Sequence, residues 1–232
     1  MLKIKTILSV SLTLFLGMIL TGCMMKQTTK IAEFPEIYRE SPTSILILPP
    51  VNKSTDADAT NYYSTTIPSP LLLLGYYVFP YELTSEILKQ ELTSEILKQG
   101  GIYDSELLRK IPLDRFFNYF GADAVLFTTI NKWDFSYAKL ASSLTVSIDC
   151  KIKSTHTSKT LWSYNGKVVV ALGGGNGGSN LTDLPSQAIA TAAQTVTRRA
   201  MLALPYGRYH ELYHQDMEQK IVDQTPEKKA AQ

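Results

Sequence analysis

The sequence predicts a single α/β (α+β) domain in which a mixed β-sheet of about five strands is flanked by helices. Three observations predict this fold. Residues 125–130 are apolar on both faces, as expected of a central strand covered by helices on each side. Residues 144–153 alternate apolar and polar side chains, which is the period of a half-buried strand. Residues 185–204 place apolar side chains at helical spacing, so the predicted domain ends with a long helix.

The first half of the domain contains two predicted strands and a long polar loop. Residues 45–48 form a short apolar run that Pro49 and Pro50 end, which suits a buried first strand. Residues 52–66 are rich in Ser, Thr, Asp and Asn and predict a long loop, a kind of segment that is often functional. Leucines at 71–74 indicate the end of a helix. Gly75 then indicates a turn that leads into a second strand at 76–79.

A nine-residue sequence occurs twice in tandem, at 82–90 and at 91–99. Nine residues are about two and a half helical turns, so the apolar side chains of the second copy point away from those of the first. One helix cannot bury both apolar stripes against one sheet. We therefore expect either a two-faced helix or a break between the copies, with the second copy tolerated at the surface. Gly100 and Gly101 suit the end of this helix.

The second half predicts two short helices, further strands and the final helix. Residues 107–120 form one or two short helices, with Pro112 near the start of the second. A turn at 154–159 leads to β-type sequence at 160–164 and 167–172, and Pro205 ends the last helix. The apolar stripe of that helix consists of Ile189, Ala193, Val196 and Ala200.

Cys150 lies in the alternating strand, on the same predicted face as Val146, Ile148 and Ile152. We interpret it as a small core residue, because a reactive thiol needs an accessible site that favours the thiolate. The only other cysteine is Cys23.

The amino terminus has the features of a lipoprotein signal. Lys3 and Lys5 precede an apolar run at 7–20, which is short for a membrane span. It closes with the sequence Leu20-Thr21-Gly22-Cys23, in which Leu20, Thr21 and Gly22 are the predicted signal-peptidase recognition residues and Cys23 the lipidated residue. Several acyl chains on Cys23 would anchor the chain permanently. The alternative is an ordinary signal peptide with a chance cysteine.

The predicted organisation is a signal peptide at 1–22, a lipid-anchored tether at 23–43, one domain at 44–205 and a polar C-terminal tail at 206–232. Removal of the signal takes away Lys3 and Lys5 but no acidic residue, so the formal charge falls from +2 to zero. A nucleic-acid-binding protein carries a clustered basic excess, so nucleic acid is an unlikely partner. Met24 stands where an inner-membrane retention signal would place Asp, which favours the outer membrane, at its periplasmic face or at the cell surface.

Two motifs suggest chemistry. His210, Glu211 and His214 spell H-E-x-x-H, which on a helix is the signature of zinc proteases. Only a short charged tail follows to supply a third ligand, so a zinc hydrolase is the alternative and not the first interpretation. The glycine-rich segment 173–178 satisfies G-x-G-x-x-G, but no strand follows the next helix and no acidic residue lies about twenty positions on. We therefore predict a loop there and no cofactor.

Four tyrosines flank the long loop and form a candidate interaction surface, although tyrosine in half-buried strands is also common core material. They are Tyr62, Tyr63, Tyr76 and Tyr77. The loop at 52–66 is also the candidate site if the protein binds a small ligand.

Six segments occur in an order that resembles a bacterial family of outer-membrane lipoproteins of unknown function, one member of which is a surface antigen considered for vaccines. The segments are LTGC at 20–23, ILILPP at 45–50, GYYVFP at 75–80, GADAVL at 121–126, LWS at 161–163 and PY at 205–206. The resemblance covers residues 18–215 and implies a fold similar to the amino-terminal domain of TolB. It also implies a link to CsgG-type lipoprotein systems and provides no catalytic residues. The tandem repeat departs from the family pattern.

From these observations we expect a non-enzymatic, lipid-anchored scaffold or accessory component of outer-membrane assembly or export. Its expected partners are the outer membrane, through the lipid, and other envelope lipoproteins or outer-membrane proteins, with CsgG-type proteins as candidates. The sequence is also compatible with a homo-oligomer. The alternatives are the zinc hydrolase and a periplasmic small-ligand-binding protein.

Overall fold

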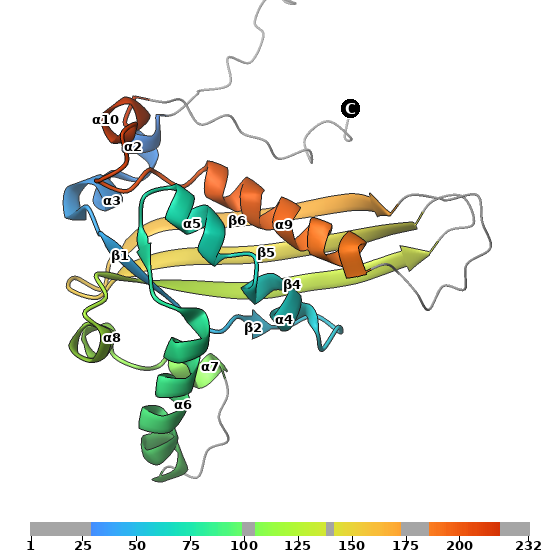
Figure 1. The fold of residues 1–232 in the computed structure, drawn as a ribbon, viewed down its shortest axis with the longest axis horizontal. Helices are drawn as coiled ribbons and strands as arrows, with labels where there is room; N and C mark the ends of the chain where they lie inside the picture. Colours follow the sequence, from blue (N-terminus) through green and yellow to red (C-terminus); the bar gives the residue numbers. More distant parts are fainter. Residues whose placement is uncertain (1–28, 99–104, 138–141, 173–185, 219–232) are drawn as a thin grey trace, which may run out of the picture.

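A computed structural model describes residues 29–98, 105–137, 142–172 and 186–218 as one mixed sheet flanked by helices (Figure 1). The strand order is β3-β1-β4-β5-β6, and β2 pairs with β4 beyond the end of β1. β1 is parallel to β3 and β4, β2 is parallel to β4, and β4, β5 and β6 are antiparallel. The strands are β1 (Ser44–Ile47), β2 (Val51–Asn52), β3 (Tyr77–Val78), β4 (Ala124–Tyr137), β5 (Ser142–Ser154) and β6 (Thr160–Leu172). The predicted fold class is confirmed.

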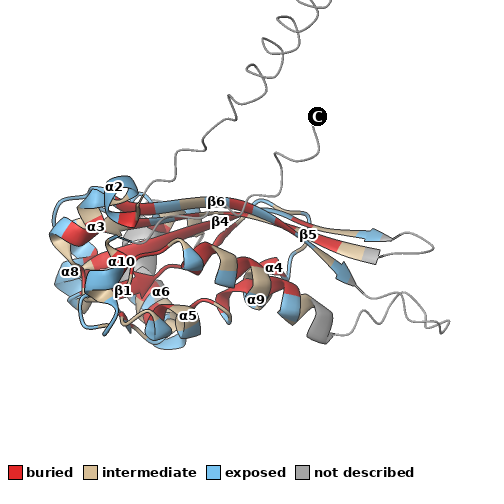
Figure 2. Ribbon diagram, turned by 90° about the horizontal axis from the view of Figure 1, so that it is seen from above, coloured by how far each residue is buried: buried red, intermediate tan, exposed pale blue. Residues whose placement is uncertain are grey.

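Helices cover both faces of the sheet. α4, α5 and α9 lie together on one face (Figure 2), whereas α6, α7 and α8 pack against the other face beside β1 and β4. Within the described ranges, no helix is both long and apolar enough to cross a membrane. The helices are α2 (Lys30–Glu33), α3 (Pro35–Glu40), α4 (Ala59–Ser64), α5 (Pro68–Leu73), α6 (Tyr81–Lys98), α7 (Ser105–Leu108), α8 (Leu113–Phe120), α9 (Ser186–Leu202) and α10 (Tyr213–Asp216).

The two helical layers produce two hydrophobic cores on opposite faces of β1 and β4. Ile45 and Leu126 contribute to the core beneath α4, α5 and α9, whereas Leu46 and Val125 contribute to the core beneath α6, α7 and α8. Successive side chains of a strand point to opposite faces, so a strand covered on both sides must be apolar at every position. The expectation of a central strand at 125–130 is confirmed.

β5 has a single buried face, as its alternating sequence predicts. Leu144, Val146, Ile148, Cys150 and Ile152 are all fully buried. Burial raises the pKa of the Cys150 thiol to about 11, so this group stays protonated at neutral pH. The interpretation of Cys150 as a core residue is confirmed.

The final helix and the strand before it also follow the sequence pattern. In α9, Ala193, Val196 and Ala200 are fully buried against the sheet, and Ile189 packs beside them. Residues 160–172, which read as two β-type runs, form the single strand β6.

The folded region extends beyond both predicted domain boundaries. The predicted tether at 23–43 is corrected from residue 29 onward, because α2 and α3 form there and bury Lys30, Ile37 and Tyr38. The predicted tail at 206–232 is corrected as far as residue 218, because this segment contains α10 and buries Asp216. Short helices that pack through few side chains produce only a weak sequence pattern.

The predicted loop at 52–66 is also corrected. Val51 and Asn52 form β2, and α4 occupies residues 59–64, so only residues 53–58 and 65–66 of the predicted loop lie outside a strand or helix. α4 buries Ala59, Tyr63 and Ser64 against the sheet. Its sequence has no long apolar stripe, because a helix of six residues needs only one or two core contacts.

The tandem repeat forms one continuous helix, α6, which runs away from the sheet (Figure 1). In the first copy, Thr84 and Leu88 are buried and Leu83 is 55% exposed. A nine-residue shift on a continuous helix turns the second copy by about half a turn relative to the first. Of the two expected arrangements, the continuous helix at 81–98 excludes a break between the copies. Gly100 and Gly101, the expected end of the helix, lie outside the described residues.

Deletion of residues 91–99 is expected to leave the melting temperature unchanged or raised and to reduce self-association. The deletion removes an apolar stripe that cannot face the same core as Leu88, and exposed apolar stripes promote association. Thermal melting and analytical ultracentrifugation measure the two effects. Leu88→Ala is the matched control, because it truncates a buried side chain and should cost about 2–5 kcal/mol. A loss of several degrees in the deletion variant would mean that the second copy is packed.

Candidate functional site

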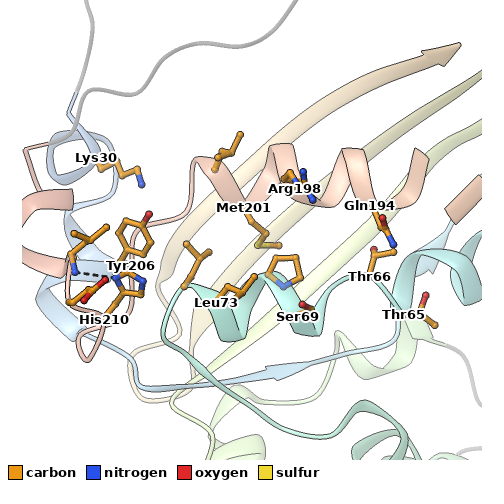
Figure 3. A pocket seen from close by; sticks show the side chains of 15 residues that line it. Lys30, Thr65, Thr66, Ser69, Leu73, Gln194, Arg198, Met201, Tyr206 and His210 are labelled. Carbon is orange, nitrogen blue, oxygen red and sulfur yellow. Dashed lines mark hydrogen bonds between the residues drawn. The ribbon is translucent and has the colours of Figure 1, made fainter. Parts of the chain in front are cut away.

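A groove of about 720 Å³ lies between α5, α9 and the segment that follows α9. Lys30, Tyr206 and His210 lie at one end of it, and Thr65 and Gln194 lie at the other (Figure 3). The groove is lined by Lys30, Thr65, Thr66, Ser69, Pro70, Leu73, Leu74, Gln194, Arg198, Met201, Leu202, Tyr206, His210, Glu211 and Leu212. Thr65 and Thr66 are the part of the predicted 52–66 loop that reaches this site.

Large apolar side chains surround the opening of the groove. Leu73 is 74% exposed and Leu202 is 58% exposed, although both belong to helices that pack on the sheet. Leu212 lines the same groove, and Leu72 and Tyr209 are exposed in the adjacent turns of the chain. Exposed apolar side chains gathered around a concave site indicate a contact surface more strongly than scattered ones do.

A buried polar cluster closes one end of the groove. The Lys30 ammonium group donates to Asp216 Oδ1 at 2.6 Å and to the Leu204 carbonyl at 3.2 Å. Asp216 Oδ2 accepts from the Tyr38 hydroxyl and from the Tyr206 N–H, both at 2.9 Å. We call Lys30, Tyr38, Tyr206 and Asp216 the clasp.

The clasp joins the two ends of the folded chain through groups that water does not reach. Lys30 is 5% exposed and Asp216 is 2% exposed. Burial, together with the hydrogen bond to Asp216, raises the pKa of Tyr38 well above its usual value, so its hydroxyl remains a donor. A buried carboxylate is tolerated only when its charge is paired and its oxygens are hydrogen-bonded, and both conditions hold for Asp216.

A close backbone crossing holds the same end of the groove. The Gly207 N–H donates to the Leu74 carbonyl at 2.7 Å, and the Tyr76 hydroxyl donates to the Pro205 carbonyl at 2.9 Å. A Cβ atom on residue 207 would lie 2.6 Å from the Gly75 carbonyl oxygen, so only glycine fits. The loop after α9 is therefore fixed to the turn before β3.

The H-E-x-x-H segment does not have the geometry of a zinc protease. His210 and Glu211 precede α10, so the motif is not carried on one helix. His210 Nδ1 accepts from the Leu212 N–H at 3.1 Å, and its ring stacks on Tyr206 with centroids 4.1 Å apart. Among the described residues, no group of three or more His, Cys, Asp or Glu side chains could hold a metal ion. The single-face arrangement that the hydrolase alternative requires is absent.

The four candidate tyrosines do not form one surface. Tyr63 and Tyr76 are core residues, with exposed fractions of 0% and 3%. Tyr62 is half-buried and stacks on Trp133, whereas Tyr77 is 58% exposed. The predicted four-tyrosine surface is therefore corrected, because Tyr63 and Tyr76 are buried, and a contact through the exposed Tyr77 stays a prediction.

Other predicted site residues lie outside the described part of the chain. These are the signal-peptidase recognition residues Leu20, Thr21 and Gly22, the lipidated Cys23 and the glycine-rich segment 173–178.

The sequence interpretation missed Lys30 and Asp216, because each stands in a segment that was expected to be unstructured. A weak signal was present. Ile31, Phe34 and Tyr38 recur at near-helical spacing around Pro35, which is favoured at the first position of a helix. No comparable pattern identifies the carboxylate that would pair with Lys30.

The chain is similar to bacterial lipoproteins. The family model described as "Putative lipoprotein GNA1162-like" matches residues 33–206. "Putative lipoprotein NMB1124/NMB1162" of Neisseria meningitidis serogroup B is 28% identical over 194 residues, which cover 83% of this chain and 85% of the relative. The crystal structure of lipoprotein GNA1162 from Neisseria meningitidis is 29% identical, with a TM-score of 0.48, and the match covers 67% of this chain and 99% of that one. The PelC dodecamer from Paraburkholderia phytofirmans is 10% identical, with a TM-score of 0.42, over 70% and 88% of the two chains.

Proposed function

The chain belongs to the GNA1162-like family of lipoproteins, and we propose that it is a non-enzymatic scaffold of the outer membrane, anchored by lipid on Cys23. In this proposal it stands at the periplasmic face or at the cell surface and takes part in envelope assembly or export. Its partners are other envelope lipoproteins or outer-membrane proteins.

The clasp is the observation that carries this proposal. Lys30 lies seven residues after Cys23, and it is fixed to the domain by a buried ion pair with Asp216. Seven extended residues span at most about 25 Å. A domain with such a short attachment stays at the membrane surface, where partners in or on the same membrane are within its reach.

Three potentially reactive side chains of the domain, Cys150, His210 and Asp216, have structural roles, which supports a scaffold over an enzyme. The Cys150 thiol is buried and protonated. His210 accepts a backbone hydrogen bond, and Asp216 is neutralised by Lys30. A catalytic site instead needs a nucleophile or base directed toward an open position.

Photocrosslinking in intact cells tests the scaffold proposal. A photoreactive amino acid at Tyr77, which is exposed on the short edge strand β3, should give discrete crosslinked bands that contain envelope proteins. The matched control is the same amino acid at Val169, which is 59% exposed on β6. If neither this position nor Leu83, exposed on α6, gives a discrete envelope partner, the scaffold proposal fails.

A further inference from the structure

We propose that the apolar rim of the groove is a membrane-docking face that contacts phospholipid. The docking rim consists of Leu73, Leu202 and Leu212, which line the groove, together with the exposed Leu72 and Tyr209, which are next to the lining residues Leu73 and His210 in the sequence. In this proposal the leucines enter the boundary between headgroups and acyl chains, and neighbouring arginines contact the phosphates. The inference rests on the proposed lipid anchor at Cys23 and adds the orientation of the domain on the bilayer.

The short connection to the proposed anchor limits how the domain can face the membrane. Seven residue steps separate Cys23 from Lys30 and span at most about 25 Å. A compact domain of this size is about 40 Å across, which exceeds that reach. Orientations that place α2 on the side of the domain farthest from the bilayer are therefore excluded, and those that bring α2 close to the bilayer are favoured. Lys30 itself lines the groove, so the groove begins at this end (Figure 3).

The exposed side chains at this end suit a bilayer interface. Tyr209 is 77% exposed, Leu73 74%, Leu202 58% and Leu72 54%. Leucines partly buried between headgroups and acyl chains gain hydrophobic free energy, and tyrosine is enriched at the headgroup level of membranes. These side chains come from α5, from the end of α9 and from the segment after it, so the fold brings three separate parts of the sequence to one rim.

The charged groups around the rim favour anionic headgroups. Arg198 lines the groove, and Arg208 is exposed beside Tyr209, with its guanidinium group 5.4 Å from that ring. Glu211 is the carboxylate that lines the groove, and His214 is exposed one turn further on. The charge of Lys30 is neutralised by Asp216. Besides the paired Lys30, the lining holds one arginine and one carboxylate, and Arg208 next to Tyr209 adds a further positive charge that negatively charged phospholipids attract.

The outward face of the β4–β5–β6 sheet differs from the docking rim and provides a control surface. It carries a hydrogen bond of 2.8 Å from Asn131 to Asp149, and Asn165 also donates to Asp149. Lys151 and Val169 are exposed on the same face. α9 packs on the opposite face of this sheet, so a probe at Val169 reports on the side away from the groove.

Fluorescence quenching by lipid tests the docking rim with the full lipidated protein. The protein is reconstituted in vesicles of phosphatidylethanolamine with a minority of phosphatidylglycerol. A thiol-reactive fluorophore is attached to Leu73→Cys, to Leu202→Cys or, as the control, to Val169→Cys. Cys23 is blocked by its lipid and Cys150 is fully buried, so neither native cysteine competes for the label. Lipids with quenchers at different depths then locate each probe.

The proposal expects strong quenching at positions 73 and 202, at a depth of about 5–10 Å below the headgroups, and none at position 169. Arg198→Glu combined with Arg208→Glu should weaken quenching at position 73, whereas Glu211→Gln should not. Equal quenching at all three positions, or none at any, in protein that floats with the vesicles would overturn the docking face and leave the anchor intact.

Two other outcomes also overturn the proposal. Protein that does not float with the vesicles would remove both the anchor and the docking face. A probe at position 73 that lipid does not quench, but that becomes shielded from water in native envelope fractions, would assign the groove to a protein partner.

Discussion

Asp216→Ala is expected to lower the melting temperature by about 6–20 °C. Removing one partner of a buried ion pair costs about 3–5 kcal/mol, because the charge that remains is buried without compensation. For a domain of this size, each kcal/mol shifts the melting temperature by about 2–4 °C. In the variant, Lys30 keeps only the Leu204 carbonyl as an acceptor, and the Tyr38 hydroxyl and the Tyr206 N–H lose theirs.

Asp216→Ala should also promote local unfolding around α2, in addition to lowering the melting temperature of the whole domain. The clasp connects α2 to α10, so the variant should expose the chain around α2 to proteolysis before the sheet unfolds. Limited proteolysis followed by mass spectrometry would detect cleavage near Ile31. Loss of that segment would separate the lipid anchor from the domain.

Glu218→Ala is the matched control, because it removes an exposed carboxylate only two residues from Asp216 and should change stability by less than about 0.5 kcal/mol. Lys30→Met should also destabilise, since it leaves the Asp216 carboxylate without its cation. The double variant should lose less than the sum of the two single losses. Additive losses, or a melting temperature for Asp216→Ala that matches the control, would show that Lys30 and Asp216 do not stabilise the fold as a pair.

The central part of the fold could be predicted because long elements repeat their pattern. β5 repeats an apolar position five times between Leu144 and Ile152, and every one of these side chains is buried. The stripe from Ile189 to Ala200 likewise identifies the buried face of α9. Each pattern reports how one element faces the core, and it needs no knowledge of the partner element.

The candidate site could not be predicted in the same way. Lys30 and Asp216 are 186 residues apart, and each sits on a helix of four residues. A helix of one turn has no periodicity to detect, and a buried charge resembles an exposed one in sequence. The H-E-x-x-H motif was misleading for a related reason. It places two zinc ligands on one face only when it lies on a helix, and His210 precedes α10.

In the proposed arrangement, the roles of the clasp and of the docking rim both depend on the short segment between Cys23 and Lys30. In the proposed arrangement the domain is held near the bilayer by its α2 end, so the exposed apolar side chains of the docking rim would contact lipid instead of open water. The clasp is needed for this arrangement, because without it α2 could unfold and lengthen the connection. Stability at this end and orientation on the membrane are therefore coupled properties.

Cys23→Ala is expected to abolish lipid attachment and to leave the protein as an unprocessed or mislocalised precursor. In the proposed processing, the Cys23 thiol accepts the diacylglyceryl group, and cleavage before residue 23 requires that modification. Palmitate labelling and envelope fractionation measure the effect. Cys150→Ala is the matched control, because it removes the other cysteine, which is buried, and should leave labelling unchanged.

The residue after the lipidated cysteine gives a further expected result in the same assay. Met24→Asp should keep the palmitate label but shift the protein from the outer to the inner membrane, because Asp at this position retains a lipoprotein there. Labelling of Cys23→Ala together with outer-membrane fractionation would refute the anchor. Retained labelling with no shift in Met24→Asp would instead refute only the sorting argument. The two variants therefore separate attachment from destination, and only attachment determines how closely Lys30 and the groove are held to a bilayer.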